Sequence, residues 1–174
     1  MSYKKPSVSE LIALLDKPGL LYWANKIGLQ GTKLSDYKKQ STGAGISLHQ
    51  QISEKIKTGK EIIGHVLKEK FSVFEKKVNI IDSEIHLETD YFTGRADIRF
   101  SYKGNDYISD FKSSQTIYLE HKLQLCAYKM AFPDCNISIT NLPDLITTPI
   151  KIDFEKGAKI LIALSEIYKL KNEL

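Results

Sequence analysis

The fold is decided by the stretch from Thr93 to Tyr128, which reads TGRADIRFSYKGNDYISDFKSSQTIYLEHKLQLCAY. Its first half predicts a β-hairpin, because apolar and polar residues alternate on both sides of the turn-forming pair Gly104-Asn105. With this pair as the loop, Asp97 lies across from Lys112, and Asp110 lies diagonally beside them. The other face of the hairpin is apolar and forms the core face, with Ile98, Phe100, Tyr102, Tyr107 and Phe111.

Two carboxylates that converge beside a lysine indicate a hydrolytic metal site. Hard oxygen donors suit Mg²⁺ or Mn²⁺, and such an ion polarises a phosphoryl oxygen and lowers the pKa of a bound water. The alternative interpretation is a surface sheet face with complementary charges, which contributes little energy and has no chemical role. The hairpin alone leaves both interpretations open.

Four short motifs follow one another over residues 43–128. They are GAGISLH at 43–49, GRAD at 94–97, DFK at 110–112 and QLCAY at 124–128. The series resembles the glycine-then-histidine, GxxD, DxK and QxxxY motifs of the RecB-like branch of the PD-(D/E)XK nuclease superfamily. The small phage-type and mitochondrial-genome-maintenance-type exonucleases of this branch are the most similar in length. One departure is Asp110, where many members carry glutamate, and the shorter aspartate still binds a metal.

The resemblance implies a Mg²⁺ or Mn²⁺ site with four ligands. These are His49, Asp97, Asp110 and the main-chain carbonyl of Phe111. From the residues alone, His49 has another interpretation, because it falls near the apolar face of a helix that carries Ile46, Ile52 or Ser53, Ile56 and Ile63 at helical spacing. On that interpretation it is a core histidine hydrogen-bonded to a neighbouring element.

The resemblance also implies the catalytic set, which comprises Asp97, Asp110, Lys112, Gln124 and Tyr128. Lys112 is expected to orient or activate the water and to offset negative charge on the phosphate. Gln124 and Tyr128 share one helical stripe and are expected to position the lysine or the DNA strand beside the centre. The alternative is that this stripe is a half-exposed helix face.

The chain of 174 residues has the length of one domain. The predicted fold is α/β (α+β), a mixed central sheet with the αβββαβ core of restriction-endonuclease-like proteins, flanked by helices. Residues 1–42 are expected to form N-terminal helices and a loop, and residues 43–174 the catalytic core.

Within that core, hydrophobic periodicity predicts the individual elements. A long helix is expected over 45–70, with a kink or break near Thr58-Gly59, because glycine is unfavourable inside a helix. The remaining predictions are a strand over 71–81, a short strand over 83–88, a helix over 116–131 capped by Ser113-Ser114, closing strands over 136–140 and 148–152, and a helix over 153–170.

Composition describes an ordinary soluble protein, with 42% hydrophobic and 26% charged residues. The net charge of +4 permits a nucleic-acid partner without demanding one. Cys126 and Cys135 show no metal spacing and no disulfide framework, which favours a reducing cytoplasmic setting. No signal peptide or membrane span is visible, so no membrane partner is expected.

The predicted function is a metal-dependent DNA nuclease that hydrolyses phosphodiester bonds in single- or double-stranded DNA. An exonuclease of phage or bacterial DNA recombination, repair or processing is favoured, because no base-reading motif or specificity domain is present. The alternatives are a structure-specific endonuclease and a non-catalytic nucleic-acid-binding module. Asp97, Asp110 and Lys112 argue against the binding module, since two adjacent carboxylates repel phosphate unless a cation bridges them.

Overall fold

The computed structural model describes residues 4–15, 18–31, 33, 35, 48–114 and 116–173. The glycine half of the first motif, residues 43–47, lies outside the described residues, whereas His49 lies within them.

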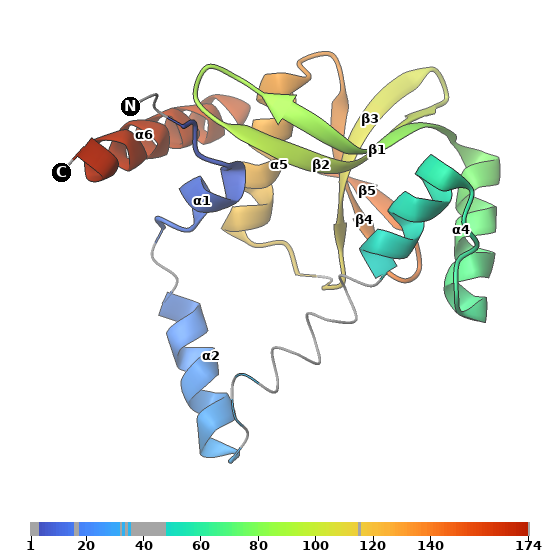
Figure 1. The fold of residues 1–174 in the computed structure, drawn as a ribbon, viewed down its shortest axis with the longest axis horizontal. Helices are drawn as coiled ribbons and strands as arrows, with labels where there is room; N and C mark the ends of the chain where they lie inside the picture. Colours follow the sequence, from blue (N-terminus) through green and yellow to red (C-terminus); the bar gives the residue numbers. More distant parts are fainter. Residues whose placement is uncertain are drawn as a thin grey trace.

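A five-stranded sheet forms the centre of the fold, in the order β1-β2-β3-β4-β5 (Figure 1). The strands are β1 Asn79–Glu88, β2 Thr93–Tyr102, β3 Asn105–Lys112, β4 Asn136–Asn141 and β5 Ile146–Pro149. The helices are α1 Val8–Ile12, α2 Pro18–Leu29, a helix over 48–58, α4 His65–Lys77, α5 Leu119–Ala131 and α6 Phe154–Glu173. Of the five strands described, only β3 and β4 pair with each other in parallel, and α5 is the crossover between them. The predicted mixed α/β fold is therefore confirmed.

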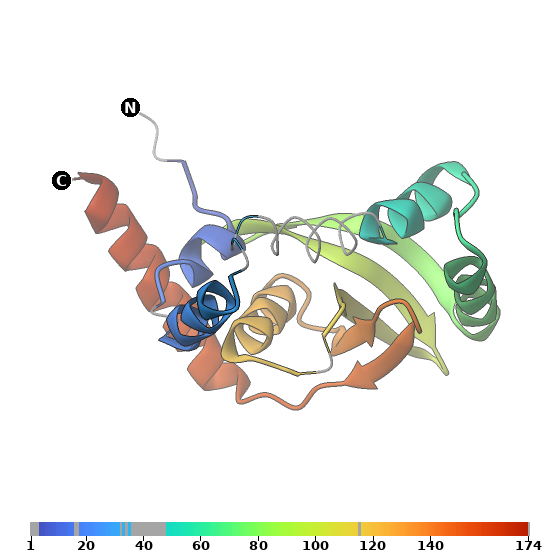
Figure 2. The same cartoon turned by 90° about the horizontal axis from the view of Figure 1, so that it is seen from below.

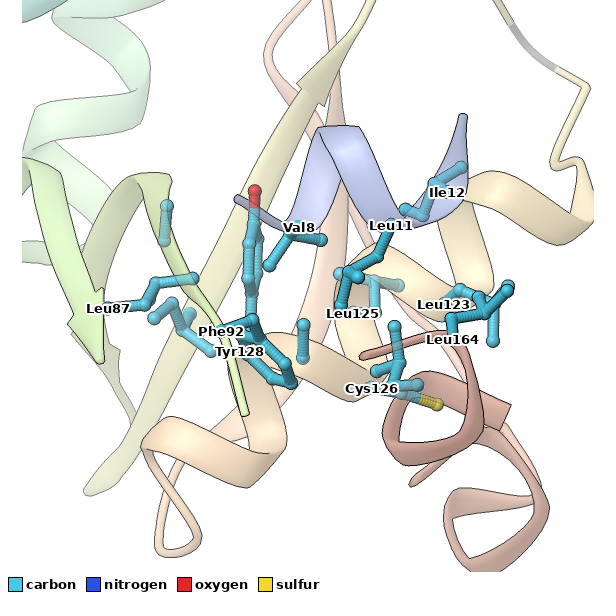
Figure 3. Packing of buried hydrophobic residues seen from close by; sticks show 14 of the residues in the cluster. Val8, Leu11, Ile12, Leu87, Phe92, Leu123, Leu125, Cys126, Tyr128 and Leu164 are labelled. Carbon is cyan, nitrogen blue, oxygen red and sulfur yellow. The ribbon is translucent and has the colours of Figure 1, made fainter. Parts of the chain in front are cut away.

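Two apolar clusters cover the sheet, and Figure 2 separates the helices that belong to each. In the first cluster, α1 and α6 pack with α5, whose Leu123, Leu125 and Tyr128 are buried (Figure 3). In the second, Ile52 of helix 48–58 and Phe71 and Phe74 of α4 pack against β2 and β3. Both faces of the strands that carry the site are thus held by helices.

The predicted long helix is interrupted, and the predicted strand over 71–81 is wrong. Helix 48–58 stops before Gly59, whose φ of 76° is unfavourable for other residues, close to the break expected at Thr58-Gly59. Phe71 to Lys77 belong to α4 instead. Leu67, Phe71 and Phe74 are buried at helical spacing, and this spacing outweighs the β-propensity of the phenylalanines.

The first strand is also longer than predicted. Residues 79–88 form one strand, β1, in place of separate strands over 71–81 and 83–88. An irregularity in its pairing with β2 falls between Ile80 and Asp82. Such a bulge disturbs the alternation of side chains along a strand, which is why the sequence reads as two short segments.

The hairpin forms, with its turn one residue earlier than predicted. Lys103 and Gly104 both have positive φ, 50° and 77°, and Tyr102 pairs with Asn105. Positive φ at both central residues is the type I′ geometry that matches the twist of two strands. This moves every cross-strand partner by two residues, so the expected pairing of Asp97 with Lys112 is wrong. A shift of two keeps each side chain on its face.

Smaller corrections concern the ends of other elements. α5 begins at Leu119 after Tyr118, rather than at residue 116 after Ser113-Ser114. β5 covers Ile146–Pro149 instead of 148–152, and α6 extends to Glu173. Among the described residues, no helix has both the length and the apolar character needed to cross a membrane.

Candidate active site

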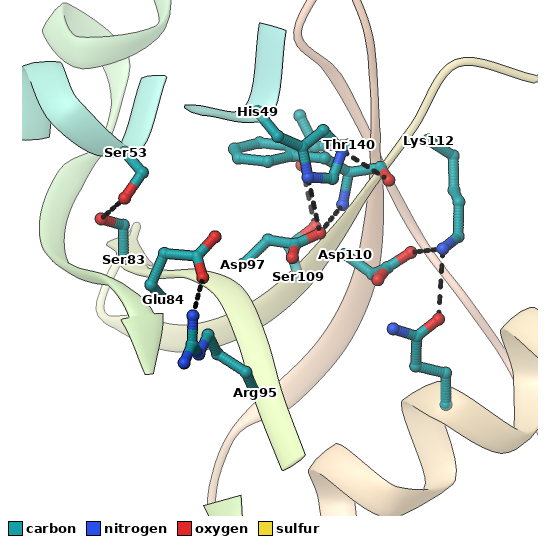
Figure 4. Close-up of polar contacts among 12 residues, drawn as sticks. His49, Ser53, Ser83, Glu84, Arg95, Asp97, Ser109, Asp110, Lys112 and Thr140 are labelled. Carbon is teal, nitrogen blue, oxygen red and sulfur yellow. Dashed lines mark hydrogen bonds and ion pairs between the residues drawn. The ribbon is translucent and has the colours of Figure 1, made fainter. Parts of the chain in front are cut away.

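Asp97 in the middle of β2 and Asp110 near the end of β3 lie side by side, just beyond the point where the two strands stop pairing. The paired residues of β2 and β3 run as far as Ile98 and Ser109, so the two aspartates lie at the next level of the sheet. Asp97 Oδ2 accepts a hydrogen bond of 2.6 Å from the main-chain N–H of Phe111 (Figure 4). Asp110 is 2% exposed because β3 is a central strand between β2 and β4.

A closed ring of polar contacts joins Asp110 to three of the other predicted catalytic residues, Lys112, Gln124 and Tyr128. Lys112 Nζ lies 2.5 Å from Asp110 Oδ2 and donates to Gln124 Oε1 at 3.1 Å. Gln124 Nε2 donates to Tyr128 Oη at 3.0 Å, and the Tyr128 hydroxyl donates to Asp110 Oδ1, also at 3.0 Å. The spacing of four residues between Gln124 and Tyr128 on α5 therefore places both side chains over the strand that carries Asp110 and Lys112. Tyr128 is fully buried, so the stripe is not a half-exposed helix face there.

His49 reaches the same centre from helix 48–58. Its Nε2 lies 3.1 Å from the carbonyl oxygen of Phe111, and its Nδ1 lies 3.7 Å from Asp97 Oδ2. Burial lowers the pKa of His49, which favours the neutral ring at pH 7. A neutral ring that donates from Nε2 to the carbonyl has a lone pair on Nδ1, and this lone pair faces the Asp97 carboxylate.

The electrostatics of the centre disfavour its negative charges. Burial, and next the nearby Asp110 carboxylate, raise the pKa of Asp97 well above its usual value. The pKa of Tyr128 is also raised well above its usual value, by burial and then by the charges of Asp110 and Asp97. The Tyr128 hydroxyl therefore remains a donor at neutral pH, and a cation near the two aspartates would relieve their repulsion.

The residues present fit a hard divalent cation. Asp110 Oδ2 is a buried oxygen that accepts no hydrogen bond, although Lys112 forms an ion pair with it. Two aspartates, a carbonyl oxygen and an imidazole nitrogen form a donor set suited to Mg²⁺ or Mn²⁺. Among the described residues, no three His, Cys, Asp or Glu side chains already stand in position to hold a metal. Asp97 and Asp110 would therefore have to turn away from the Phe111 N–H and from Lys112.

Sequence reasoning missed two residues beside this centre, Glu84 of β1 and Arg95 of β2. Arg95 Nη1 lies 3.0 Å from Glu84 Oε2 (Figure 4). Glu84 is close enough for its negative charge to act on Asp97 and His49, although burial is the main cause that raises the pKa of Asp97 and lowers that of His49. Arg95 is part of the GRAD motif at 94–97, so its position in the motif could have indicated that it lies near the site. Glu84 could be found only from the register of β1, which its bulge obscures in the sequence.

An open cavity of about 420 Å³ adjoins the centre on the α1 side. It is lined by Ser7, Val8, Ser9, His86, Thr93, Gly94, Arg95, Gln124 and Tyr128. A larger cavity of about 480 Å³ lies between α4 and β5 and contains none of the predicted site residues. Of these two cavities, the smaller one touches the predicted site, through Gln124 and Tyr128.

Comparison with known proteins adds little to this geometry. No protein-family model matches the chain, and no curated protein matches it. Among solved structures, the chain is similar to the crystal structure of SSO0001, with a TM-score of 0.44 and 13% identity over 96% of this chain and 78% of that one. A likeness this weak supports no conclusion about function. All seven predicted site residues nevertheless meet in one cluster built from helix 48–58, β2, β3 and α5.

Proposed function

We propose that this chain is a Mg²⁺- or Mn²⁺-dependent deoxyribonuclease that hydrolyses phosphodiester bonds, acting as an exonuclease. The observation that carries the proposal is the pair Asp97 and Asp110, two carboxylates at neighbouring positions of adjacent strands, with the Lys112 ammonium in an ion pair with Asp110. Buried like charges are costly unless a cation or a proton compensates them. A metal ion bound between the two carboxylates would supply the compensating positive charge, and it would also serve hydrolysis.

The aspartates, His49 and the Phe111 carbonyl would hold the metal. A bound divalent ion would polarise the scissile phosphoryl group and lower the pKa of a water at the site. Asp97 and Asp110 supply the negative charge that retains the ion. His49 contributes the Nδ1 lone pair that faces Asp97, while its hydrogen bond to Phe111 fixes the orientation of the ring.

Lys112 would act on the water and the phosphate. Its Nζ lies between Asp110 Oδ2 and Gln124 Oε1, so two partners fix its position. An ammonium held there can orient the attacking water and offset the negative charge that develops on the phosphate oxygens. Gln124 and Tyr128 would be positioning residues, since they hold Lys112 and Asp110 in place through hydrogen bonds.

The cavity beside the centre would receive the DNA strand. Arg95 and His86 supply cationic or donor groups for phosphate, and Ser7 and Ser9 supply hydroxyl groups. These groups contact a backbone without reading bases, which agrees with cleavage of little sequence preference.

A non-catalytic DNA-binding module is the second candidate. The observation in its favour is that, in the part of the chain the structure describes, no three metal-ligating side chains are already arranged around one point. A binding module would keep the cavity and its basic lining and would have no use for Lys112 against Asp110.

Cleavage of end-labelled DNA tests the proposal. Single-stranded and duplex DNA, linear and circular, would be incubated with Mn²⁺, Mg²⁺ or EDTA and with wild type, Lys112→Ala or Lys159→Ala. Lys159, an exposed lysine of α6, is the matched control. We expect metal-dependent loss of linear DNA with wild type and Lys159→Ala, and none with Lys112→Ala. Nicking of circles would make the enzyme an endonuclease, and DNA binding without cleavage would favour the binding module.

A further inference from the structure

Helix α6 carries an apolar stripe that the described part of the chain leaves exposed. The stripe consists of Ile160, Ala163, Ile167 and Leu170, which follow one another at steps of three and four residues. The exposed fractions of Ile160, Ile167 and Leu170 are 37%, 52% and 63%. Single apolar residues scattered over a surface are normal, whereas this spacing gathers the four side chains along one side of a helix.

The stripe lies on a different side of α6 from the residues that hold this helix to the rest of the molecule. The buried residues of α6 are Gly157, Leu161, Leu164 and Ser165. The helix packs mainly against α1 and α5. In Figures 1 and 2 its C-terminal end projects beyond both of these helices. A partner can therefore reach the stripe without displacing another element.

The four residues of the stripe occupy the a and d positions of a heptad pattern. In a heptad lettered a to g, Ile160 and Ile167 stand at a, whereas Ala163 and Leu170 stand at d. Isoleucine at a with leucine at d favours a parallel coiled coil of two helices. The pattern therefore indicates that the partner of the stripe is a second helix of the same kind.

Two charged side chains beside the stripe complement each other between two copies of the chain. Glu166 stands at g, and Lys171 stands five residues further on, at the e position of the next heptad. Both are exposed, and neither forms an ion pair within the described residues, whereas Lys159 is paired with Glu155 of the same helix. In a parallel dimer the g position of one helix lies beside the following e position of the other. Glu166 of each copy then lies beside Lys171 of the other copy.

We propose that α6 forms the interface of a symmetric dimer, in which the helices of two copies of this chain pack in parallel along the stripe. Such an interface is isologous, because each copy presents the same apolar residues and the same charge pair. Association removes from water the apolar surface that Ile167 and Leu170 expose in the single chain. The inference does not depend on the proposed function, because no residue of the stripe belongs to the candidate active site.

Sedimentation equilibrium in EDTA tests this inference without any measurement of metal binding or cleavage. Protein concentrations up to about 500 μM are used, because so short a seam is expected to give a Kd of about 10–100 μM. The variant of the stripe is Leu170→Glu, and its control is Val66→Glu, at a residue of α4 that is 56% exposed. The charge variants are Glu166→Lys, Lys171→Glu and the two combined. Circular dichroism verifies that each variant is folded.

We expect wild type and Val66→Glu to form dimers of equal affinity. Leu170→Glu should weaken the dimer about tenfold or more, because each copy loses a buried leucine from the interface. Each single charge reversal should raise Kd about threefold or more, and the combined reversal should return Kd to near the wild-type value. A monomer at every concentration, or a dimer that Leu170→Glu leaves unchanged, would overturn the inference. A dimer that depends on Leu170 but lacks this loss and rescue would also overturn it, because its helices would not be parallel.

Discussion

Asp97 carries a charge that its surroundings disfavour when no metal is bound. Burial and the neighbouring Asp110 raise its pKa in the folded protein well above the value of about 3.9 expected for an unfolded chain. When the pKa of a carboxyl group is higher in the folded than in the unfolded state, the free energy of unfolding falls as the pH rises from the unfolded-state pKa through the folded-state pKa. The loss is absent below about pH 4, where the carboxyl is protonated in both states, and is complete above the folded pKa.

Asp97→Asn should therefore stabilise the metal-free protein at pH 7 while abolishing metal-dependent cleavage. Asparagine is uncharged, and its side-chain oxygen can still accept the N–H of Phe111. In EDTA we expect a higher thermal midpoint than wild type at pH 7, by about 2–4 °C per kcal/mol gained, and no difference near pH 4. Addition of Mn²⁺ should stabilise wild type far more than the variant. A lower midpoint for the variant in EDTA at pH 7 would contradict this account.

Tyr128→Phe should weaken both stability and activity. The variant removes a buried hydroxyl group that accepts a hydrogen bond from Gln124 Nε2 and donates one to Asp110 Oδ1. Buried groups that lose a hydrogen-bond partner cost about 1–3 kcal/mol. Thermal unfolding would measure this cost, with Tyr102→Phe, at a half-exposed residue next to the hairpin turn, as a control that changes little. Cleavage should fall less than in Lys112→Ala, and an equal loss would give Tyr128 a direct part in the chemistry.

At the scale of the elements, α5 and α6 approach so closely that a methyl group cannot be added between them. A Cβ at Gly157 of α6 would overlap Cys126 Sγ of α5 and lie 3.1 Å from Cys126 Cβ. Burial raises the pKa of the Cys126 thiol to about 11, so this cysteine acts as a packed, protonated side chain. The closeness of the two helices holds α5, and with it Gln124 and Tyr128, against the sheet.

Gly157→Ala should destabilise the protein by about 1–3 kcal/mol, the usual cost of overpacking. In a Cys126→Ala background the same change should cost less, because the overlapping sulfur is gone. Denaturant unfolding of the four proteins of this double-mutant cycle would measure the coupling. Gly28→Ala is the control, since a Cβ at this α2 position meets nothing within 4 Å, and there alanine should be neutral or stabilising. Additive effects at Gly157 and Cys126 would show that the helices can move apart.

The type of each element could be predicted from the sequence where one hydrophobic periodicity was strong. The prediction was wrong where residue propensity and tertiary packing favoured different structures. The alternation over 93–112 predicted the hairpin, and the steps of four over 124–128 placed Gln124 and Tyr128 on one helix face. The segment from Phe71 to Lys77 was predicted to be a strand because aromatic residues favour strands. In the structure it is helical, and Phe71 and Phe74 pack against the distant β2 from one helix face. Tertiary packing therefore determines its secondary structure.

For the molecule as a whole, the order of the elements from β1 onward was predictable, whereas the register of the strands was not. Three strands, a helix and further strands follow from local patterns, but α4 was predicted in part as a strand. The placement of Asp97 needed the turn geometry at Lys103 and Gly104, where a non-glycine residue takes a positive φ. The position of Glu84 near Asp97 also needed the pairing of β1 across its bulge. Sequence patterns do not fix such long-range register, so the neighbouring Glu84 was missed.

The whole molecule should bind DNA through its charge, in a manner that depends on the metal and on salt. The net charge is +4, yet the site itself presents Glu84, Asp97 and Asp110 to a polyanion. A divalent cation would neutralise these carboxylates, so we expect tighter binding of a short duplex in Ca²⁺ than in EDTA. Each phosphate contact contributes about 0.9 to the slope of log affinity against log salt, so three contacts raise Kd about 40-fold between 50 and 200 mM salt. Fluorescence anisotropy would measure both effects. A Kd that changes less than threefold with salt, and is equal in Ca²⁺ and EDTA, would mean that the phosphate backbone is not what this site binds.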